Sequence, residues 1–326
     1  MKAIPVIPAG HECLMEAAAL VSRRRLWLAR IVLVLVALFW SLNGPLIKLL
    51  SQPQDRLPAV TIACYRSLIG GLVLLLLAWR QFPTLKRVRP GWLVGAVLVF
   101  SLMTLTFVVA TTRTAAANAI VLQYSAPIWV FLLSPLLLKE RFHPTEGLVL
   151  LIAMSGVAVI YFMHPAHDKP ALLIGLMSGL GYGLVILTLR RLRAADPMAV
   201  TAMNFLGSGL LLLPLVGVWG SFAITSSRQL FLLLTLSLVQ MSLPYLMFAW
   251  ALRYVEAHRA SLIVLLETIF NPILTYAAVG EPVPRPTLIG GPLILLGVIG
   301  WIVVTWRASS VAGSRAAHDQ AAADGK

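Results

Sequence analysis

The chain has 326 residues, of which 59% are hydrophobic and only 12% are charged, and its mean hydropathy is +0.89. Ordinary globular domains carry about 25% charged residues, so this chain has too few polar residues to cover the surface of a globular protein in water. The composition excludes an ordinary soluble protein and indicates an integral membrane protein whose solvent is largely lipid.

The charge pattern argues against a nucleic-acid-binding protein, and the cysteine content argues against a disulfide-rich or zinc-binding one. The net charge is +14, from 26 Lys and Arg against 12 Asp and Glu. The basic residues cluster at the ends of apolar runs, which is typical of topology signals in membrane proteins, so we expect no nucleic-acid partner. Cys13 and Cys64 fit neither a disulfide framework nor zinc spacing. We expect no metal site and no cofactor.

Ten apolar stretches follow one another along the chain, each about as long as the 20 or so residues that a transmembrane helix needs. They lie near residues 28–50, 57–79, 91–111, 115–138, 145–163, 171–189, 198–220, 230–252, 258–279 and 286–306. The fourth and ninth are the weakest, because both contain polar residues and proline, so nine spans is the alternative count. The sequence predicts an all-α integral membrane protein with ten transmembrane helices.

The distribution of Lys and Arg predicts the orientation. If the N-terminus is cytoplasmic, the segments on that side carry 19 Lys and Arg and the segments on the other side carry 5. Cytoplasmic segments carry the excess of basic residues, so we expect both termini in the cytoplasm and the protein in a bacterial cytoplasmic (inner) membrane. Residues 1–27 and 307–326 are expected to be tails, the first 22 residues flexible and the Ala-rich C-terminal stretch disordered.

The chain resembles itself when it is shifted by 141 residues. Glu140 then meets Glu281, and Gly156 meets Gly297. This register predicts two repeats, residues 28–163 and 164–306, of five spans each. Because five is an odd number, the second repeat enters the membrane from the opposite side. Two inverted five-helix repeats around a central cavity are the construction of secondary transporters.

Several short motifs carry a resemblance to a known family, and they are Trp40-x-x-Asn43-Gly44, Arg66, Leu136-Leu137-Leu138-Lys139-Glu140-Arg141, Gly156-Val157, Leu266-Glu267, Gly280-Glu281-Pro282 and Leu296-Gly297-Val298. With these motifs the chain resembles the EamA family of the drug/metabolite transporter superfamily over residues 30–306. The resemblance implies a ten-helix basket with a central cavity, which moves small organic solutes, most often outward. The family's usual Leu-Glu-Pro is replaced by Leu266-Glu267-Thr268, which leaves the position of the break in the ninth span open.

Two charged residues lie deep in predicted spans, where a charge is costly and needs a partner. Arg66 is near the middle of the second span, and Glu267 is midway along the ninth. They either pair with each other or separately face protein or a wet cavity. Glu267 and Asn271 share one helix face at the spacing i,i+4, and under the 141-residue shift Gln123 aligns with the same face.

Prolines and aromatic residues add further candidates. Pro127 interrupts the fourth span and Pro272 the ninth, in corresponding places of the two halves, and interrupted helices point to a transport site. Aromatic rings inside spans either line a cavity or serve ordinary packing. The complete set of candidates for the substrate cavity is Trp40, Asn43, Tyr65, Arg66, Gln123, Tyr124, Tyr182, Gln240, Tyr245, Glu267 and Asn271.

These observations favour a secondary transporter that exports an amino acid or a related metabolite. A drug exporter and an uptake carrier are the alternatives. An intramembrane enzyme is disfavoured, because the histidines lie in tails, loops or at span ends and Glu267 is the sole acid at mid-span. The expected partners are a small-molecule solute, the lipid bilayer and protons, with Glu267 as the candidate coupling residue. The oligomeric state stays open, a monomer included.

Overall fold

The computed structural model describes the backbone of residues 9–138 and 144–324. Within these residues the regular elements are all helical. Nine stretches of the described chain are long and apolar enough to cross a membrane. A further apolar stretch, Gly147–Met163, belongs to the helix in the position of the fifth predicted span. The all-α membrane fold is therefore confirmed.

The first half of the chain contains α1 (Ala9–Ser41), α2 (Asn43–Leu50), α3 (Ala59–Ala78), α4 (Pro90–Arg113), α5 (Ala116–Gln123), α6 (Ala126–Leu138) and α7 (Pro144–Met163). The second half contains α8 (Lys169–Arg191), α9 (Pro197–Trp219), α10 (Ser227–Leu234), the π-helix η4 (Thr235–Ser242), α11 (Leu243–Ala251), α12 (Ala257–Val264), α13 (Glu267–Val279) and α14 (Arg285–Asp324). Three short 3-10 helices, η1 (Pro53–Asp55), η2 (Trp79–Arg87) and η3 (Ala166–Asp168), lie in connections.

The two halves share one register. The helices α5 and α12 have the same bounds after a shift of 141 residues, and so have α6 and α13. The helices α7 and α14 also begin 141 residues apart. Glu140, which this register pairs with Glu281, lies outside the described residues. The predicted repeat is thus visible in the positions at which helices begin and end.

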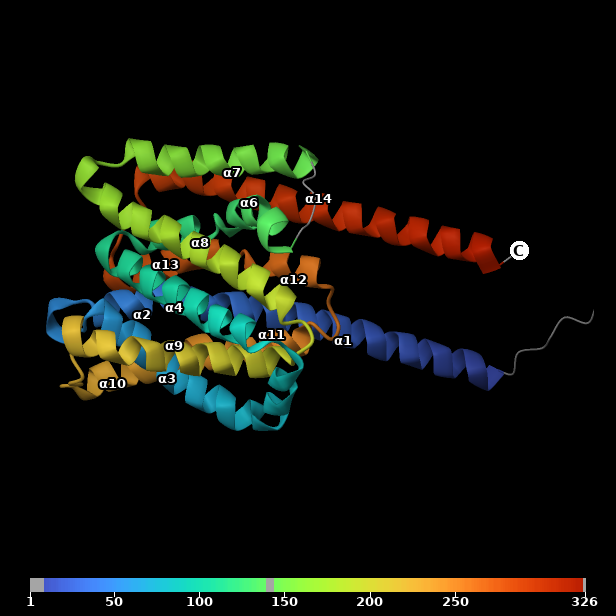
Figure 1. Ribbon diagram of the computed structural model, residues 1–326, viewed down its shortest axis with the longest axis horizontal. Helices are drawn as coiled ribbons and strands as arrows, with labels where there is room; N and C mark the ends of the chain where they lie inside the picture. Colours follow the sequence, from blue (N-terminus) through green and yellow to red (C-terminus); the bar gives the residue numbers. More distant parts are fainter. Residues whose placement is uncertain (1–8, 139–143, 325–326) are drawn as a thin grey trace, which may run out of the picture.

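Contacts between the halves follow the same symmetry. The helix α3 packs along α9, and α7 packs along α14, so corresponding spans of the two halves are neighbours (Figure 1). The contact of α4 with α8 has its counterpart in the contact of α11 with α1. Exchanging the halves therefore maps the packing onto itself, as a two-fold axis between inverted repeats requires.

Both predicted tails are helical where the structure describes them. The helix α1 begins at Ala9 and α14 continues to Asp324, so the expected flexible and disordered tails are wrong for residues 9–22 and 308–324. These stretches contain no proline and are rich in alanine, the strongest helix former. Both extensions project from the same end of the bundle, whereas η3, which joins the halves, lies at the opposite end (Figure 1).

The helix breaks in the fourth and ninth spans lie at corresponding positions of the two repeats, but only the break in the fourth span has a proline next to it. The fourth span breaks between α5 and α6 at Tyr124 and Ser125, and Pro127 lies in the first turn of α6, where a missing N–H is tolerated. The ninth span breaks at Leu265 and Leu266, and Pro272 lies inside α13. The prediction that Pro272 interrupts the ninth span is therefore wrong.

Candidate functional site

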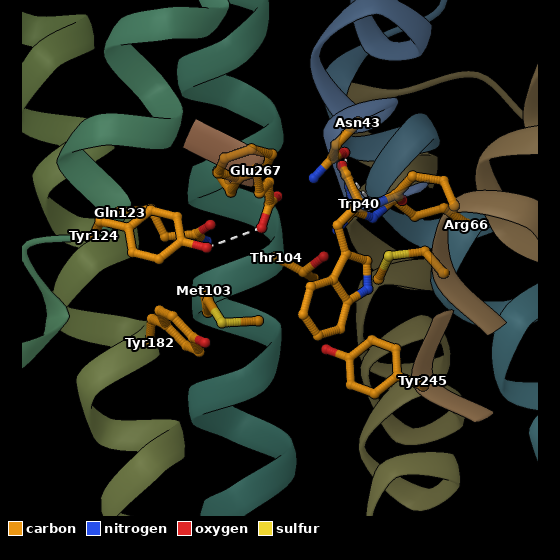
Figure 2. A pocket seen from close by; sticks show the side chains of 13 residues that line it. Trp40, Asn43, Arg66, Met103, Thr104, Gln123, Tyr124, Tyr182, Tyr245 and Glu267 are labelled. Carbon is orange, nitrogen blue, oxygen red and sulfur yellow. Dashed lines mark hydrogen bonds between the residues drawn. The ribbon is translucent and has the colours of Figure 1, made fainter. Parts of the chain in front are cut away.

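A small cavity of about 80 Å³ lies between the two halves of the bundle. Its walls include nine of the residues that the sequence suggests for a substrate cavity, namely Trp40, Asn43, Arg66, Gln123, Tyr124, Tyr182, Gln240, Tyr245 and Glu267 (Figure 2). These residues come from several spans of both repeats. The fold therefore brings together at one place side chains that are spread over more than 200 residues of sequence.

Interrupted helices position several of these side chains. Asn43 begins α2 directly after the break in the first span, and Trp40 is in the last turn of α1 before it. Tyr124 sits at the break between α5 and α6, and Glu267 is the first residue of α13. Breaks free backbone polar groups, which are tolerated at membrane depth where they are buried in protein or line a cavity.

Glu267 and Tyr124 join the two repeats across the cavity wall. The Tyr124 hydroxyl donates a hydrogen bond to Oε2 of Glu267 at 2.9 Å (Figure 2). The Glu267 residue is 8% exposed, and its backbone carbonyl accepts a hydrogen bond from the Ser41 hydroxyl at 3.3 Å. The carboxylate is therefore held by a side chain of the opposite repeat and still borders the cavity.

Arg66 lies on another wall. It is 3% exposed, and its Nη1 donates a hydrogen bond to Oδ1 of Asn43 at 2.9 Å. In the described part of the chain no ion pair links Arg66 with Glu267, and Arg66 Nε has no hydrogen-bond partner. Figure 2 shows Arg66 beside Asn43 on one side and Glu267 bound to Tyr124 on the other. Of the two arrangements that the sequence leaves open, the structure has separate, cavity-lining charges.

Aromatic side chains form the wall next to Arg66. The Trp40 ring lies edge-on to Tyr245, with 5.4 Å between the ring centroids, and Phe248 is 5.5 Å away. Tyr245 is in turn edge-on to Phe205 at 5.3 Å. Gln240 donates from Nε2 to the Trp40 backbone carbonyl at 3.4 Å. These edge-on and tilted contacts between rings give the wall a fixed shape, and the rings offer faces to a solute.

Four further lining residues are missing from the candidates that the sequence suggests, namely Met103, Thr104, Phe107 and Met241. Three of them are on α4, which has no charged residue or proline in its middle that would indicate a functional site. For Thr104 the repeat register supplies the missing signal, because a shift of 141 residues carries it onto the lining residue Tyr245. The same shift carries Met103, Phe107 and Met241 onto residues outside the lining, so it does not mark them as candidates.

Two of the residues that the sequence suggests for the substrate cavity, Tyr65 and Asn271, do not line it. The Tyr65 hydroxyl donates to the Phe222 backbone carbonyl at 2.9 Å, away from the cavity lining. Asn271 is fully buried, and its Nδ2 donates to the Ser41 backbone carbonyl at 3.2 Å. It packs against Gly44, where an added Cβ would lie 2.6 Å from Asn271 Oδ1. Asn271 ties α13 to α1, and Tyr65 ties α3 to the connection between α9 and α10. Holding segments together is the alternative role for any polar residue in a span.

Comparison with known proteins decides the family. Residues 27–162 and 169–303 each match the sequence profile of the EamA-like transporter family. The chain belongs to the EamA-like transporter family. The two matched segments coincide with the two repeats of the fold, so this EamA-like protein is a multi-pass membrane transporter of small molecules. Membership in a transporter family gives no support to an intramembrane enzyme.

Individual relatives agree with this assignment. The transporter is 29% identical over 226 residues to an uncharacterised transporter of Archaeoglobus fulgidus, covering 67% of this chain and 78% of that protein. It is 25% identical over 270 residues to the pseudopaline exporter CntI of Pseudomonas aeruginosa, covering 82% of this chain and 93% of the exporter. A solved crystal structure that is 16% identical shares the fold with a TM-score of 0.59 and covers 86% of this chain and 98% of its own.

Proposed function

We propose that this transporter exports a zwitterionic metabolite of the amino-acid class by alternating access of the central cavity. One observation carries the proposal: Arg66 and Glu267 border the same cavity without pairing with each other. A solute with one carboxylate and one ammonium group offers each of them an opposite charge. A solute with a single charged group would leave one of these buried charges without a counterion, and a solute with no charged group would leave both, which is costly at membrane depth.

Buried polar atoms without partners add support. Arg66 Nε, Thr104 Oγ1 and Gln240 Oε1 belong to lining residues, and within the described chain none of these atoms has a hydrogen-bond partner. An unpaired buried polar atom costs about 1–3 kcal/mol. A bound solute with several donors and acceptors would recover part of that cost, whereas a purely apolar compound would not. Trp40 and Tyr245 supply ring faces for an apolar side chain of the solute.

The cavity must change shape during transport. Its volume of about 80 Å³ is below the 300–1,000 Å³ that is usual for ligand pockets. Rocking of residues 28–163 against residues 164–306 would widen it on one side at a time, as in other transporters built from inverted repeats. The breaks at Tyr124 and at Leu265 are places where such movement can be taken up.

The direction of transport and the location of the protein are inferred from the distribution of basic residues and from the relative CntI. Both helical extensions leave the same end of the bundle (Figure 1), and the excess of Lys and Arg favours the cytoplasm for that end. We place the protein in the cytoplasmic membrane of a bacterium, with both termini inside. Outward transport agrees with the exporter CntI among its relatives. Glu267, as the acid that borders the cavity, is the residue that would exchange a proton for the solute.

Transport in proteoliposomes tests the proposal. Vesicles with the purified transporter should take up radiolabelled zwitterionic amino acids, but not the matching amines or carboxylic acids that lack one of the two charges. Arg66→Gln and Glu267→Gln should each reduce uptake by at least about tenfold, which corresponds to about 1.4 kcal/mol. Tyr65→Phe is the matched control, since Tyr65 lies outside the cavity. Equal transport of the singly charged analogues would contradict a zwitterion site, and preferred transport of flat cations would favour a drug exporter.

A further inference from the structure

A second hollow is lined partly by the connection between α2 and α3. That connection lies at the end of the bundle opposite the helical extensions (Figure 1). The hollow consists of two pockets, of about 330 and 540 Å³, that share Ala59 and Arg113 in their lining. The smaller pocket is formed by the connection before α3 and by the end of α4, and the larger one lies between α3, α4 and α9. The shared residues make one continuous groove with two chemically different parts.

The smaller part is basic. Arg56 and Arg113 are exposed side chains of its lining, and no acidic residue belongs to that lining. Within the described chain no hydrogen bond or ion pair holds either guanidinium. The nearby carboxylate of Asp55 is engaged elsewhere, with Arg228 Nη1 at 3.0 Å and the Ser226 hydroxyl at 3.3 Å. Two uncompensated arginines at one place suit a phosphate group.

The larger part is apolar and runs along the helices. Leu105, Val109 and Arg113 follow one another at i, i+4 and i+8 on α4, so they form one stripe. Leu215 and Trp219 form a parallel stripe on α9, four residues apart. With a rise of 1.5 Å per residue, the distance from Leu105 to Arg113 is about 12 Å. That length fits within one leaflet, whose hydrocarbon is about 15 Å thick.

We propose that this groove binds an anionic phospholipid, with the phosphate between Arg56 and Arg113 and one acyl chain along the stripes of α4 and α9. Trp219 is 70% exposed at the end of α9, where an aromatic ring suits the membrane interface. The apolar part of the groove distinguishes a lipid from a free anion, which would use the arginines alone. Since α4 belongs to the first repeat and α9 to the second, the lipid contacts both moving halves.

Native mass spectrometry of the full-length, delipidated transporter in detergent tests this site. Phosphatidylglycerol and phosphatidylcholine with identical acyl chains are added separately, and we expect tighter binding of phosphatidylglycerol. Arg56→Gln and Arg113→Gln should each weaken that binding about fivefold, the factor expected for one basic residue near a membrane surface. Arg285→Gln, at another exposed arginine on the same side of the bundle, is the matched control and should bind like the parent protein.

A second variant tests the apolar part of the groove, and a competing anion tests whether the arginines alone are enough for binding. The double substitution Leu105→Trp and Val109→Trp fills the apolar part and should weaken binding of both lipids, while a melting temperature near that of the parent shows that it is folded. Inorganic phosphate at the same concentration as the lipid should displace none of it. Equal binding of the two lipids, an unchanged lipid preference after loss of both arginines, or displacement by inorganic phosphate would each overturn the proposal.

Discussion

Lys48 and Glu281 form an ion pair across the two repeats, with 2.5 Å between Nζ and Oε2. Lys48 is in the last turn of α2, and Glu281 lies in the loop before α14. Their side chains are only 14% and 22% exposed. Lys48 also donates to the Thr114 backbone carbonyl at 2.8 Å, and Oε1 of Glu281 accepts from the Ala116 backbone N–H at 2.7 Å. The pair therefore fastens three segments at the end of the bundle that we place outside the cell.

A polar network continues inward from this pair. Asn118 Nδ2 donates to the Thr114 hydroxyl at 2.7 Å and lies 3.2 Å from Nε2 of His164, which follows α7. The Thr287 hydroxyl of α14 donates to Oδ1 of Asn118. Thr114 and Asn118 belong to the first repeat and Thr287 to the second, and these three residues and His164 are all buried. This end of the bundle is thus closed by bonds between the halves, which must loosen before the cavity can open there.

Loss of the ion pair should make the cavity more accessible from outside. Lys48→Met and Glu281→Gln each leave one partly buried charge unpaired, which favours the open arrangement. In a background with Cys13→Ala and Cys64→Ala, a cysteine introduced by Thr104→Cys should react about tenfold faster with a membrane-impermeant thiol reagent, the factor that corresponds to about 1.4 kcal/mol. The exchange of both charges, Lys48→Glu with Glu281→Lys, should restore slow labelling in part. Unchanged labelling in both single variants would show that the pair does not close this end.

Glu267→Gln should remove the pH dependence of transport. The amide keeps the size of the side chain and can still accept a hydrogen bond from Tyr124, but it has no proton to exchange for the solute. Counterflow in proteoliposomes at several pH values measures this, with Tyr124→Phe as a variant that keeps the titratable group and should keep the pH dependence. A Glu267→Gln protein that still transports with the pH profile of the parent would refute proton coupling at this residue.

Arg66→Lys should lower the affinity for the solute although the charge is kept. A lysine lacks the planar fork that lets Arg66 donate to Asn43 and at the same time face the cavity. Loss of one hydrogen bond to a charged group costs about 1.5–3 kcal/mol, so the apparent KM should rise at least about tenfold. Uptake at increasing solute concentration measures the change. A KM equal to that of the parent would mean that the cavity uses Arg66 only as a point charge.

Gly44→Ala should destabilise the protein. A Cβ at this position would lie 2.6 Å from Asn271 Oδ1 and 2.7 Å from Thr275 Oγ1, on the fully buried contact between α2 and α13. Overpacking of this kind costs about 1–3 kcal/mol, which should lower the melting temperature in detergent. Gly95→Ala on α4 is the matched control, because nothing lies within 4 Å of its Cβ. Equal melting temperatures of the two variants would contradict the tight contact.

Much of this fold can be predicted from the sequence because the protein lies in a bilayer. Lipid offers no hydrogen bonds to the backbone, so long apolar helices are obligatory, and their positions follow from hydropathy alone. The 141-residue shift also predicts the register of α5 with α12 and of α6 with α13. A charge at membrane depth must face protein or water, which is why Arg66 and Glu267 stand out as candidates from their place in the sequence alone.

Packing alone decided how each helix is rotated and what each polar group meets. Tyr65 and Tyr124 are both tyrosines inside spans, yet one holds the Phe222 carbonyl and the other holds Glu267 at the cavity. Pro272 lies within α13, and the ninth span breaks at Leu265 and Leu266 instead. Such outcomes depend on contacts between segments more than 100 residues apart, and no local pattern encodes them.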